Sequence, residues 1–264
     1  MAALGPMQGL ILFFPQRQYN VSGLKNSVLN QGEKIMEPLE PALLDRLRTF
    51  NTPTVANAIE VFDVRPRNEG FMRPEIRCIF PNLGVMVGYA VTLKIQSVTP
   101  GAKGAAIPAR VHWQDIMKVP APRVIVVEDL DDPPGLGSFW GEVNGNMHRA
   151  MGCVGAVTNG CVRDLDEVEP LGFHFFASHV AVSHAYVHIV EVGTPVRVGG
   201  LTVRPGDLLH GDRHGVTNIP LDLAARIPEG VKVVDTMERQ IINYSQSPRF
   251  TVEGLMALWE RLRP

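Results

Sequence analysis

The stretch Val154-Gly-Ala-Val-Thr-Asn-Gly-Cys-Val-Arg-Asp164 carries the pattern that decides the expected fold. It begins with an apolar run of strand length, continues with the turn signal Asn159-Gly160, and ends on a charged Arg-Asp pair. An earlier apolar run covers residues 123–128, and residues 139–151 between the two runs suit a helix. Strands that alternate with helices predict an α/β domain, in which ligands bind beyond the carboxyl ends of the strands.

The pattern on either side of this stretch extends the same domain. Apolar residues at helical spacing predict a helix that begins near Pro38, and a second helix is expected over residues 54–62 after Asn51-Thr-Pro53. Further strands are expected over residues 84–95, 173–177, 185–192, 196–198, 201–203, 207–210 and 216–219, with a helical tail from residue 221. We therefore expect one α/β domain over residues 36–264 with terminal helices. Residues 1–35 are expected to form a poorly ordered N-terminal extension, with Met36 as an alternative start.

Composition excludes several classes of protein. The chain has 264 residues, with 25 basic and 27 acidic side chains, so it lacks the broad positive field that nucleic-acid binding needs. Its three cysteines are Cys78, Cys153 and Cys161; they form no C-x-x-C pair, which favours a reducing cytoplasm over a disulfide framework. No apolar run approaches the roughly 18 residues of a membrane-spanning helix. We expect a cytoplasmic protein that binds neither nucleic acid nor membrane.

A glycine-rich loop connects the strand at residues 123–128 to the helix at 139–151. Its glycines, Gly135, Gly137 and Gly141, miss the G-x-G-x-x-G spacing of a dinucleotide site by one residue. A loop of this kind that leads into a helix still offers backbone N–H groups to an anion. The expected ligand is therefore a small carboxylate or a phosphate rather than a dinucleotide.

Charged residues follow both strands. Arg163-Asp164 by itself would be read as a surface ion pair, or as an aspartate that caps the helix beginning near Leu165. If the two strands are neighbours, however, Glu142, Arg163 and Asp164 converge with the amides near Gly141 at one edge of the sheet. A carboxylate for a hard cation, a guanidinium and free amides together suit an α-keto acid.

These motifs resemble those of the 4-hydroxy-4-methyl-2-oxoglutarate aldolase family, which also contains the regulator of ribonuclease activity A, the RraA-like proteins. Gly141-Glu142, twenty intervening residues and Arg163-Asp164 match the family's acidic-x20-Arg-Asp signature. The other matching segments, within a similarity that covers roughly residues 40–245, are Asn51-Thr-Pro-Thr-Val-Ala-Asn-Ala58, Gly88-Tyr-Ala-Val-Thr92, Gly155–Asp164, Val203-Arg-Pro-Gly-Asp207, and Gly211-Asp-Arg-His-Gly-Val216 with Pro220.

The resemblance implies a swivelling β/β/α sandwich and a class II pyruvate aldolase that acts on 4-hydroxy-2-oxo acids and decarboxylates oxaloacetate. It implies Asp164 as the protein ligand of Mg²⁺ or Mn²⁺, Arg163 as the contact to the keto oxygen, and Glu142 as a holder of metal-bound waters. It also implies a homotrimer or homohexamer with active sites between subunits, where Glu238 from a neighbouring subunit would serve proton transfer. The expected substrate-binding residues are Gly141, Glu142, Val143, Asn144 and Arg163.

Two departures from the family pattern leave other functions open. The signature begins with Glu142 where aldolases often carry Asp, and Gly211-Asp-Arg-His-Gly215 replaces the Ala-Asp-Asp-Asp-Gly of many relatives. One alternative is a lyase or dehydratase that acts on another hydroxy acid or sugar acid. The other is a non-catalytic regulator that binds an RNA-processing enzyme, although such regulators are thought to lack the complete metal-binding signature.

Two further groups of residues are candidates for binding. The histidines at 174, 179, 184 and 188 lack the spacing of a zinc site and are expected to be structural, with His179 or His184 lining the pocket. The arginines at 65, 67, 73 and 77 lack interleaved aromatic residues, so a solvated face or a subunit contact is favoured over RNA binding.

Overall fold

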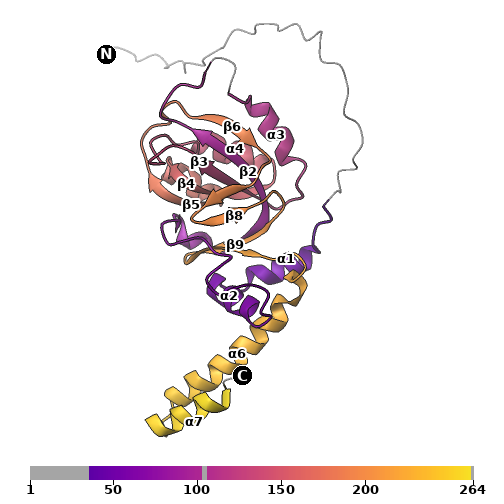
Figure 1. The fold of residues 1–264 in the computed structure, drawn as a ribbon, viewed down its shortest axis with the longest axis vertical. Helices are drawn as coiled ribbons and strands as arrows, with labels where there is room; N and C mark the ends of the chain where they lie inside the picture. The colour runs from indigo at the N-terminus through magenta and orange to yellow at the C-terminus, as the bar shows by residue number, and fades with distance from the viewer. Residues whose placement is uncertain (1–35, 103–105, 263–264) are drawn as a thin grey trace, which may run out of the picture. The chain divides into compact units, whose positions relative to one another are not determined.

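In the computed structural model, which describes residues 36–102 and 106–262, four parallel strands form the centre of the main sheet (Figure 1). They are β2 (Met86–Gln96), β3 (Arg123–Asp129), β4 (Cys153–Val162) and β5 (His174–Val180). The sheet order is β1-β5-β4-β3-β2-β9-β10, and β6 pairs with the second half of β2. The antiparallel strands are β1 (Arg77–Cys78), β6 (His188–Val192), β9 (Leu208–Asp212) and β10 (Gly215–Ile219).

One short segment joins the two edges of this sheet. Phe71 pairs with Thr217 on β10, whereas Arg77 pairs with Ala177 on β5. Arg77 follows Phe71 by six positions, and extended chain covers about 3.3 Å per residue, so the two edges lie within about 20 Å of each other. The sheet is therefore nearly closed, like a barrel.

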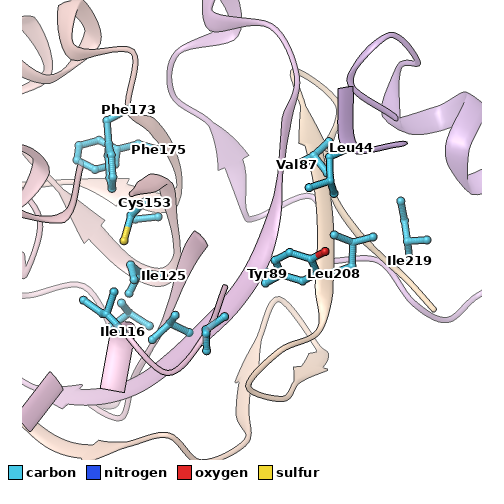
Figure 2. Close-up of a cluster of buried hydrophobic side chains, with 14 of the residues drawn as sticks. Leu44, Val87, Tyr89, Ile116, Ile125, Cys153, Phe173, Phe175, Leu208 and Ile219 are labelled. Atoms are coloured by element: carbon cyan, nitrogen blue, oxygen red, sulfur yellow. The ribbon is translucent and has the colours of Figure 1, made fainter. Parts of the chain in front are cut away.

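Side chains of the central strands alternate between two cores, as the pleat requires. On β3, Ile125 and Val127 face one core, and Val124 and Val126 face the other. The first core is covered by helices; Figure 2 shows part of it, with Phe173, Phe175 and Cys153 grouped apart from Leu44, Leu208 and Ile219. The second core is covered by a two-stranded ribbon of β7 (Val196–Val198) and β8 (Leu201–Val203). Ribbon, sheet and helices form the β/β/α layers that the resemblance implies.

The helices lie where the sequence predicts them, except the helix over residues 109–116, which the sequence pattern did not predict. They are α1 (Pro41–Arg48), α2 (Thr52–Glu60), α3 (Ala109–Ile116), α4 (Glu142–Ala150), α5 (Leu165–Val168), α6 (Ile227–Ser245) and α7 (Val252–Leu262), with short 3-10 turns at Pro81–Leu83, Glu169–Leu171 and Ala224–Arg226. Asn51 begins α2 because its side chain accepts the N–H of Thr54 at 2.8 Å. The helical tail expected from residue 221 is present, and α6 packs on α2 and α7.

One predicted turn is wrong. Asn159-Gly160 does not end the strand, because β4 continues to Val162 through an irregularity between Thr158 and Cys161. The Asn159 side chain explains this: its Oδ1 accepts the N–H of Asp129 at 2.8 Å, and its Nδ2 donates to the carbonyl of Asp129 at 2.9 Å. These two bonds tie β4 to β3 where the ladder is interrupted, so an Asn-Gly pair lies inside a strand.

The described residues from Met36 onward form one compact unit. The expectation for residues 1–35 lies outside the described residues. Within the described ranges, none of the helices combines the length and the apolar character that crossing a membrane requires.

Candidate functional site

The loops that follow β3 and β4 meet at one edge of the sheet, as the sequence predicts. β3 and β4 are parallel neighbours, so both chains leave the sheet at the same edge. Trp140, in the loop after β3, forms an isolated parallel bridge with Val162 at the end of β4. This bridge places Gly141 and α4 beside Arg163 and Asp164.

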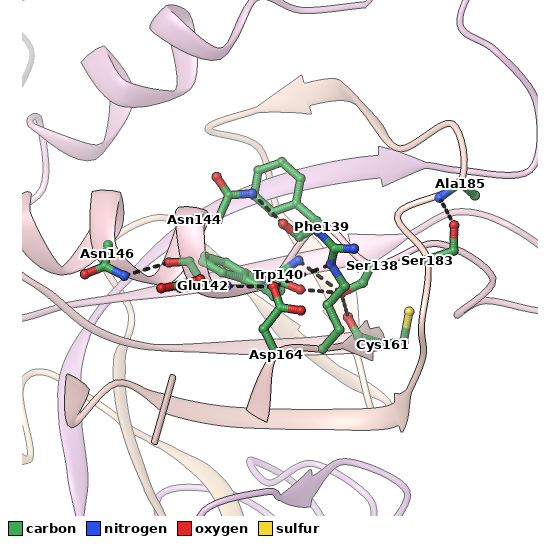
Figure 3. A network of polar contacts seen from close by, with 11 residues as sticks. Ser138, Phe139, Trp140, Glu142, Asn144, Asn146, Cys161, Asp164, Ser183 and Ala185 are labelled. Atoms are coloured by element: carbon green, nitrogen blue, oxygen red, sulfur yellow. Dashed lines mark hydrogen bonds and ion pairs between the residues drawn. The ribbon is translucent and has the colours of Figure 1, made fainter. Parts of the chain in front are cut away.

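Asp164 directs its carboxylate at the start of α4. Its backbone is left-handed, with φ 55° and ψ 49°, a conformation that costs energy for any residue with a Cβ. It occupies the N-cap position of α5, but its side chain makes no capping hydrogen bond there. Instead, Asp164 Oδ2 accepts the N–H of Glu142 at 3.0 Å, as Figure 3 shows. The reading of Asp164 as a helix cap is therefore wrong.

Arg163 lies close to the same carboxylate oxygen. Its Nε is 3.7 Å from Asp164 Oδ2, and both side chains are about one-third exposed, at 35% and 32%. The positive end of the α4 dipole and the guanidinium thus both face Asp164. The two charged side chains remain accessible from solvent.

Gly141 is required here because there is no room for a side chain, not because of its backbone conformation. Its φ of −175° is extended and open to any residue. A Cβ on Gly141, however, would lie 2.3 Å from Asp164 Oδ2 and 3.3 Å from Arg163 Nε. Only glycine lets the carboxylate approach the backbone of α4 this closely.

The other expected substrate-binding residues form the first turn of α4. Glu142 is exposed, and the Val143 side chain is 71% exposed. Asn144 is different, because its Nδ2 donates to the carbonyl of Phe139 and so holds the preceding loop. The structure therefore brings Gly141, Glu142, Arg163 and Asp164 together, and gives the Asn144 side chain a supporting contact.

Ser138 supports the site, and sequence reasoning missed it. It is buried, and its hydroxyl lies within donating distance of two carbonyls, that of Trp140 at 2.6 Å and that of Cys161 at 3.0 Å. The same oxygen accepts the N–H of Trp140 at 3.2 Å. One hydroxyl thereby fixes the loop before Gly141 to β4. No motif marks this serine, because its partners are backbone groups from two separate segments.

The glycine loop itself does not offer the free amides that its sequence suggests. The N–H of Gly135 donates to Asp129 Oδ2 at 2.8 Å, and that of Gly137 donates to Ser97 Oγ at 3.0 Å. These bonds fold the loop back on the strand ends. The expected anion contacts are therefore limited to the start of α4.

The predicted contributor Glu238 and the altered loop at residues 211–215 lie elsewhere in the chain. Glu238 is on α6, where its Oε1 accepts Asn57 Nδ2 of α2 at 3.4 Å. In the loop at residues 211–215, Asp212 Oδ2 accepts the N–H of Thr52 at the start of α2 at 2.9 Å. In the described part of the chain, neither forms a hydrogen bond or ion pair with the Arg163–Asp164 site.

The histidines at 174, 179, 184 and 188 do not gather into one site. His174 is buried, and burial lowers its pKa to about 4. His184 and His188 are bonded to carbonyls of their own loop, from Ala185 and Tyr186. His179 lines a pocket with Asn159 and Arg197 that contains no residue of the Arg163–Asp164 site.

The residues at Asp164 fit a hard divalent cation with few protein ligands. Among the described residues, no group of three histidine, cysteine or acidic side chains could hold a metal ion. Mg²⁺ commonly keeps several waters and takes only one or two carboxylates plus substrate oxygens. The partly exposed carboxylate of Asp164, on a residue with a left-handed backbone, makes no capping bond to its own helix and can supply such a ligand.

Comparison with known proteins gives a matching family and several distant relatives. A family model described as Aldolase/RraA matches residues 52–217, which include β2 to β9 and the whole candidate site. Protein MJ0644 of Methanocaldococcus jannaschii is 26% identical over 199 residues, covering 74% of this chain and 85% of that protein. Two further relatives are matched over about a third of their own length.

A protein of Azotobacter vinelandii named "Putative 4-hydroxy-4-methyl-2-oxoglutarate aldolase" is 35% identical over 119 residues, covering 39% of this chain and 72% of that protein. Among solved structures, Streptomyces coelicolor RraAS2, described as an unusual member of the RNase ES inhibitor RraA protein family, superposes with a TM-score of 0.61. It is 20% identical and covers 77% of this chain and 97% of that chain, so the likeness concerns the fold.

Proposed function

This chain belongs to the Aldolase/RraA family, and from that premise we propose that it is a divalent-metal-dependent carbon–carbon lyase. The proposed reaction is the cleavage of 4-hydroxy-2-oxo acids of the 4-hydroxy-4-methyl-2-oxoglutarate type, which releases pyruvate. Oxaloacetate decarboxylation accompanies it, because both reactions pass through the enolate of pyruvate.

The observation that carries this proposal is the meeting of a backbone N–H and a guanidinium at one carboxylate. Asp164 Oδ2 lies 3.0 Å from the Glu142 nitrogen and 3.7 Å from Arg163 Nε, at the exposed edge of the sheet. A dianionic keto acid needs three groups for binding: an acid that ligates a cation, a permanent positive charge and a helix N-terminus. Gly141 allows this arrangement because it has no Cβ to collide with the Asp164 carboxylate.

Asp164 is the residue proposed to hold Mg²⁺ or Mn²⁺, and Glu142 is proposed to orient the waters around the ion. When bound, the ion would act as a Lewis acid on the carboxylate and carbonyl oxygens of the keto acid. Arg163 supplies a second cation to the keto oxygen, where negative charge develops as the carbon–carbon bond breaks. No lysine lies in the signature to form a Schiff base.

Proton transfer requires a group that removes a proton from the donor alcohol and returns one to the enolate carbon. Glu142 is one proposed group, since it begins α4 next to Asp164 and is exposed. Glu238 is the other, supplied by a neighbouring subunit in a homotrimer or homohexamer. Within its own chain Glu238 lies on α6, where its Oε1 accepts Asn57 Nδ2, so we propose this role for the Glu238 of a second copy.

The test is a pyruvate-release assay with a panel of 4-hydroxy-2-oxo acids and oxaloacetate, each with and without Mg²⁺ or Mn²⁺. Metal-dependent pyruvate release from at least one 4-hydroxy-2-oxo acid supports the proposal. Release of no pyruvate from any of them would contradict it. That outcome would favour the two alternatives, a regulator of an RNA-processing enzyme or a lyase for another hydroxy or sugar acid.

A further inference from the structure

A basic pocket lies where the segment that joins the sheet edges passes under the β7–β8 ribbon. Its volume is about 480 Å³, and its charged lining consists of Arg73, Arg77 and Arg197 with Glu75. Segments far apart in the sequence supply it: the approach to β1, strand β7, strand β4 with Asn159, and strand β5 with His179. None of its lining residues belongs to the Arg163–Asp164 site.

The backbone holds these arginines in place and leaves their guanidinium groups available. The N–H of Arg73 donates to the carbonyl of Gly199 at 2.8 Å, and that of Arg197 donates to Glu128 Oε2 at 3.0 Å. All three arginines are exposed. Among the residues that the structure describes, none of the three has a carboxylate within ion-pair distance.

A neighbouring pocket differs from the first in the hydrogen bonds of its arginines. It shares Arg73 with the first pocket, and its other arginine is Arg65. The Arg65 guanidinium donates to the Asn218 side chain and, at 3.3 Å, to Thr217 Oγ1. Burial also lowers the pKa of Arg65. Arg65 is therefore occupied in holding β10, whereas the arginines of the first pocket have no such partner.

The charge and lining of the first pocket select its ligand. Three arginines and one glutamate give a formal charge of 3 − 1 = +2 within a chain whose net charge is −2. Guanidinium groups bind carboxylate and phosphate oxygens in pairs. The lining has no phenylalanine, tyrosine or tryptophan on which a nucleobase could stack. Its volume lies within the range of small-molecule sites, about 300–1,000 Å³.

We propose that this pocket binds a small polyanion, a phosphate or a polycarboxylate without an aromatic ring, at a site separate from the lyase site. The proposal does not depend on the lyase activity. The two ligand sources share the same oxygen chemistry and are separated by the experiment below.

The experiment is calorimetric titration of the full chain with inorganic phosphate and, separately, with citrate, in metal-free buffer of constant ionic strength with chloride as the reference anion. We expect saturable binding of one anion per chain. Arg73→Gln and Arg197→Gln should each weaken it at least about fivefold, since each removes a charged donor. Glu75→Gln should strengthen binding, because it removes the opposing charge. Arg110→Gln, at an exposed arginine of α3 outside the pocket, is the matched control.

Two outcomes assign the ligand and two overturn the proposal. Tighter binding of phosphate assigns a phosphate site, and tighter binding of citrate assigns a polycarboxylate site. Arg163→Ala should leave binding unchanged; loss of binding in that variant would place the anion at the lyase site and overturn the proposal. Unchanged affinity in an Arg73→Gln/Arg197→Gln double variant that is folded by circular dichroism would also overturn it, and a change in its mass by light scattering would then assign the arginines to a subunit contact.

Discussion

Asp164 Oδ2 accepts the backbone N–H of Glu142 at 3.0 Å, so the carboxylate after β4 is held against the first residue of α4. This contact joins the two loops that carry the acidic-x20-Arg-Asp signature. It exists only because residue 141 has no side chain, since a Cβ there would lie 2.3 Å from the same oxygen. The conformation of Asp164 and the identity of residue 141 are therefore linked.

Replacing Gly141 with alanine tests this link. We expect Gly141→Ala to displace Asp164 and to lower kcat/KM for pyruvate release by about 100-fold, as for the loss of a main charge stabiliser. Gly145→Ala is the matched control on the same helix, because its Cβ would meet no atom closer than 3.6 Å. Equal activity in the two variants would show that the close approach of Asp164 to α4 is not needed.

The charged pair should be essential for turnover but not for folding. Arg163→Ala and Asp164→Ala are each expected to lower activity by at least about 100-fold. Asp164→Asn should do the same while keeping the fold, because asparagine tolerates the left-handed backbone observed at φ 55°. Steady-state kinetics and melting temperature, measured on the same preparations, separate the two effects. An active Asp164→Asn variant would remove the carboxylate from the mechanism.

Glu238 is expected to act across a subunit boundary. Glu238→Gln should lower kcat and leave metal affinity largely unchanged, since proton transfer is the step that it is proposed to serve. Mixed oligomers of Glu238→Gln and Arg163→Ala chains should recover activity, because one chain supplies Arg163 and the other supplies Glu238. Wild-type turnover by Glu238→Gln, or no recovery in mixed oligomers, would contradict this role. Glu238 would then have only the structural contact with Asn57 that is observed.

A buried histidine pair behind the site predicts a loss of stability in acid. His112 and His148 lie with their Nε2 atoms 3.0 Å apart, and burial lowers their pKa values to about 3 and about 4. The unfolded chain therefore binds more protons than the folded chain below about pH 6.5, so the stabilisation is complete above that pH and is lost as the pH falls toward 4.

The free energy of unfolding should fall by roughly 3 kcal/mol for one such imidazole over this interval. Urea unfolding between pH 7.5 and pH 4.5 measures it, and a His112→Phe/His148→Phe variant that folds should lose less stability than the wild type over the same range. Parallel pH profiles for the two proteins would contradict this assignment, because the other acid-sensitive groups are common to both.

The sequence predicts this fold well where apolar periodicity is decisive. The runs that became β3 and β4 are buried on both faces, so their pairing and the common edge of their loops follow from the pattern. The prediction of a turn at Asn159-Gly160 was wrong because two long-range hydrogen bonds between Asn159 and Asp129 outweigh the local turn preference. The prediction that the Gly135 and Gly137 amides are free to bind an anion was wrong for a similar reason. Side chains from other segments accept hydrogen bonds from both N–H groups.

Other features depend on contacts that no local pattern encodes. Ser138 binds backbone groups of Trp140 and Cys161, and the pocket of Arg73 and Arg197 forms only when the joining segment passes under the ribbon. The left-handed conformation of Asp164 is equally invisible in the sequence. Spacing located the candidate site, whereas the tertiary structure determines which groups in it are free.

The central claim is that the Asp164 carboxylate holds a divalent cation on which carbon–carbon cleavage depends. Its most direct test is pyruvate release from a 4-hydroxy-2-oxo acid by wild-type and Asp164→Asn protein, each stripped with EDTA and then reloaded with Mn²⁺, with protein-free Mn²⁺ as the background. The account predicts that stripping abolishes wild-type turnover, that Mn²⁺ restores it, and that Asp164→Asn stays inactive in both states. Undiminished turnover by the stripped wild-type protein would contradict it.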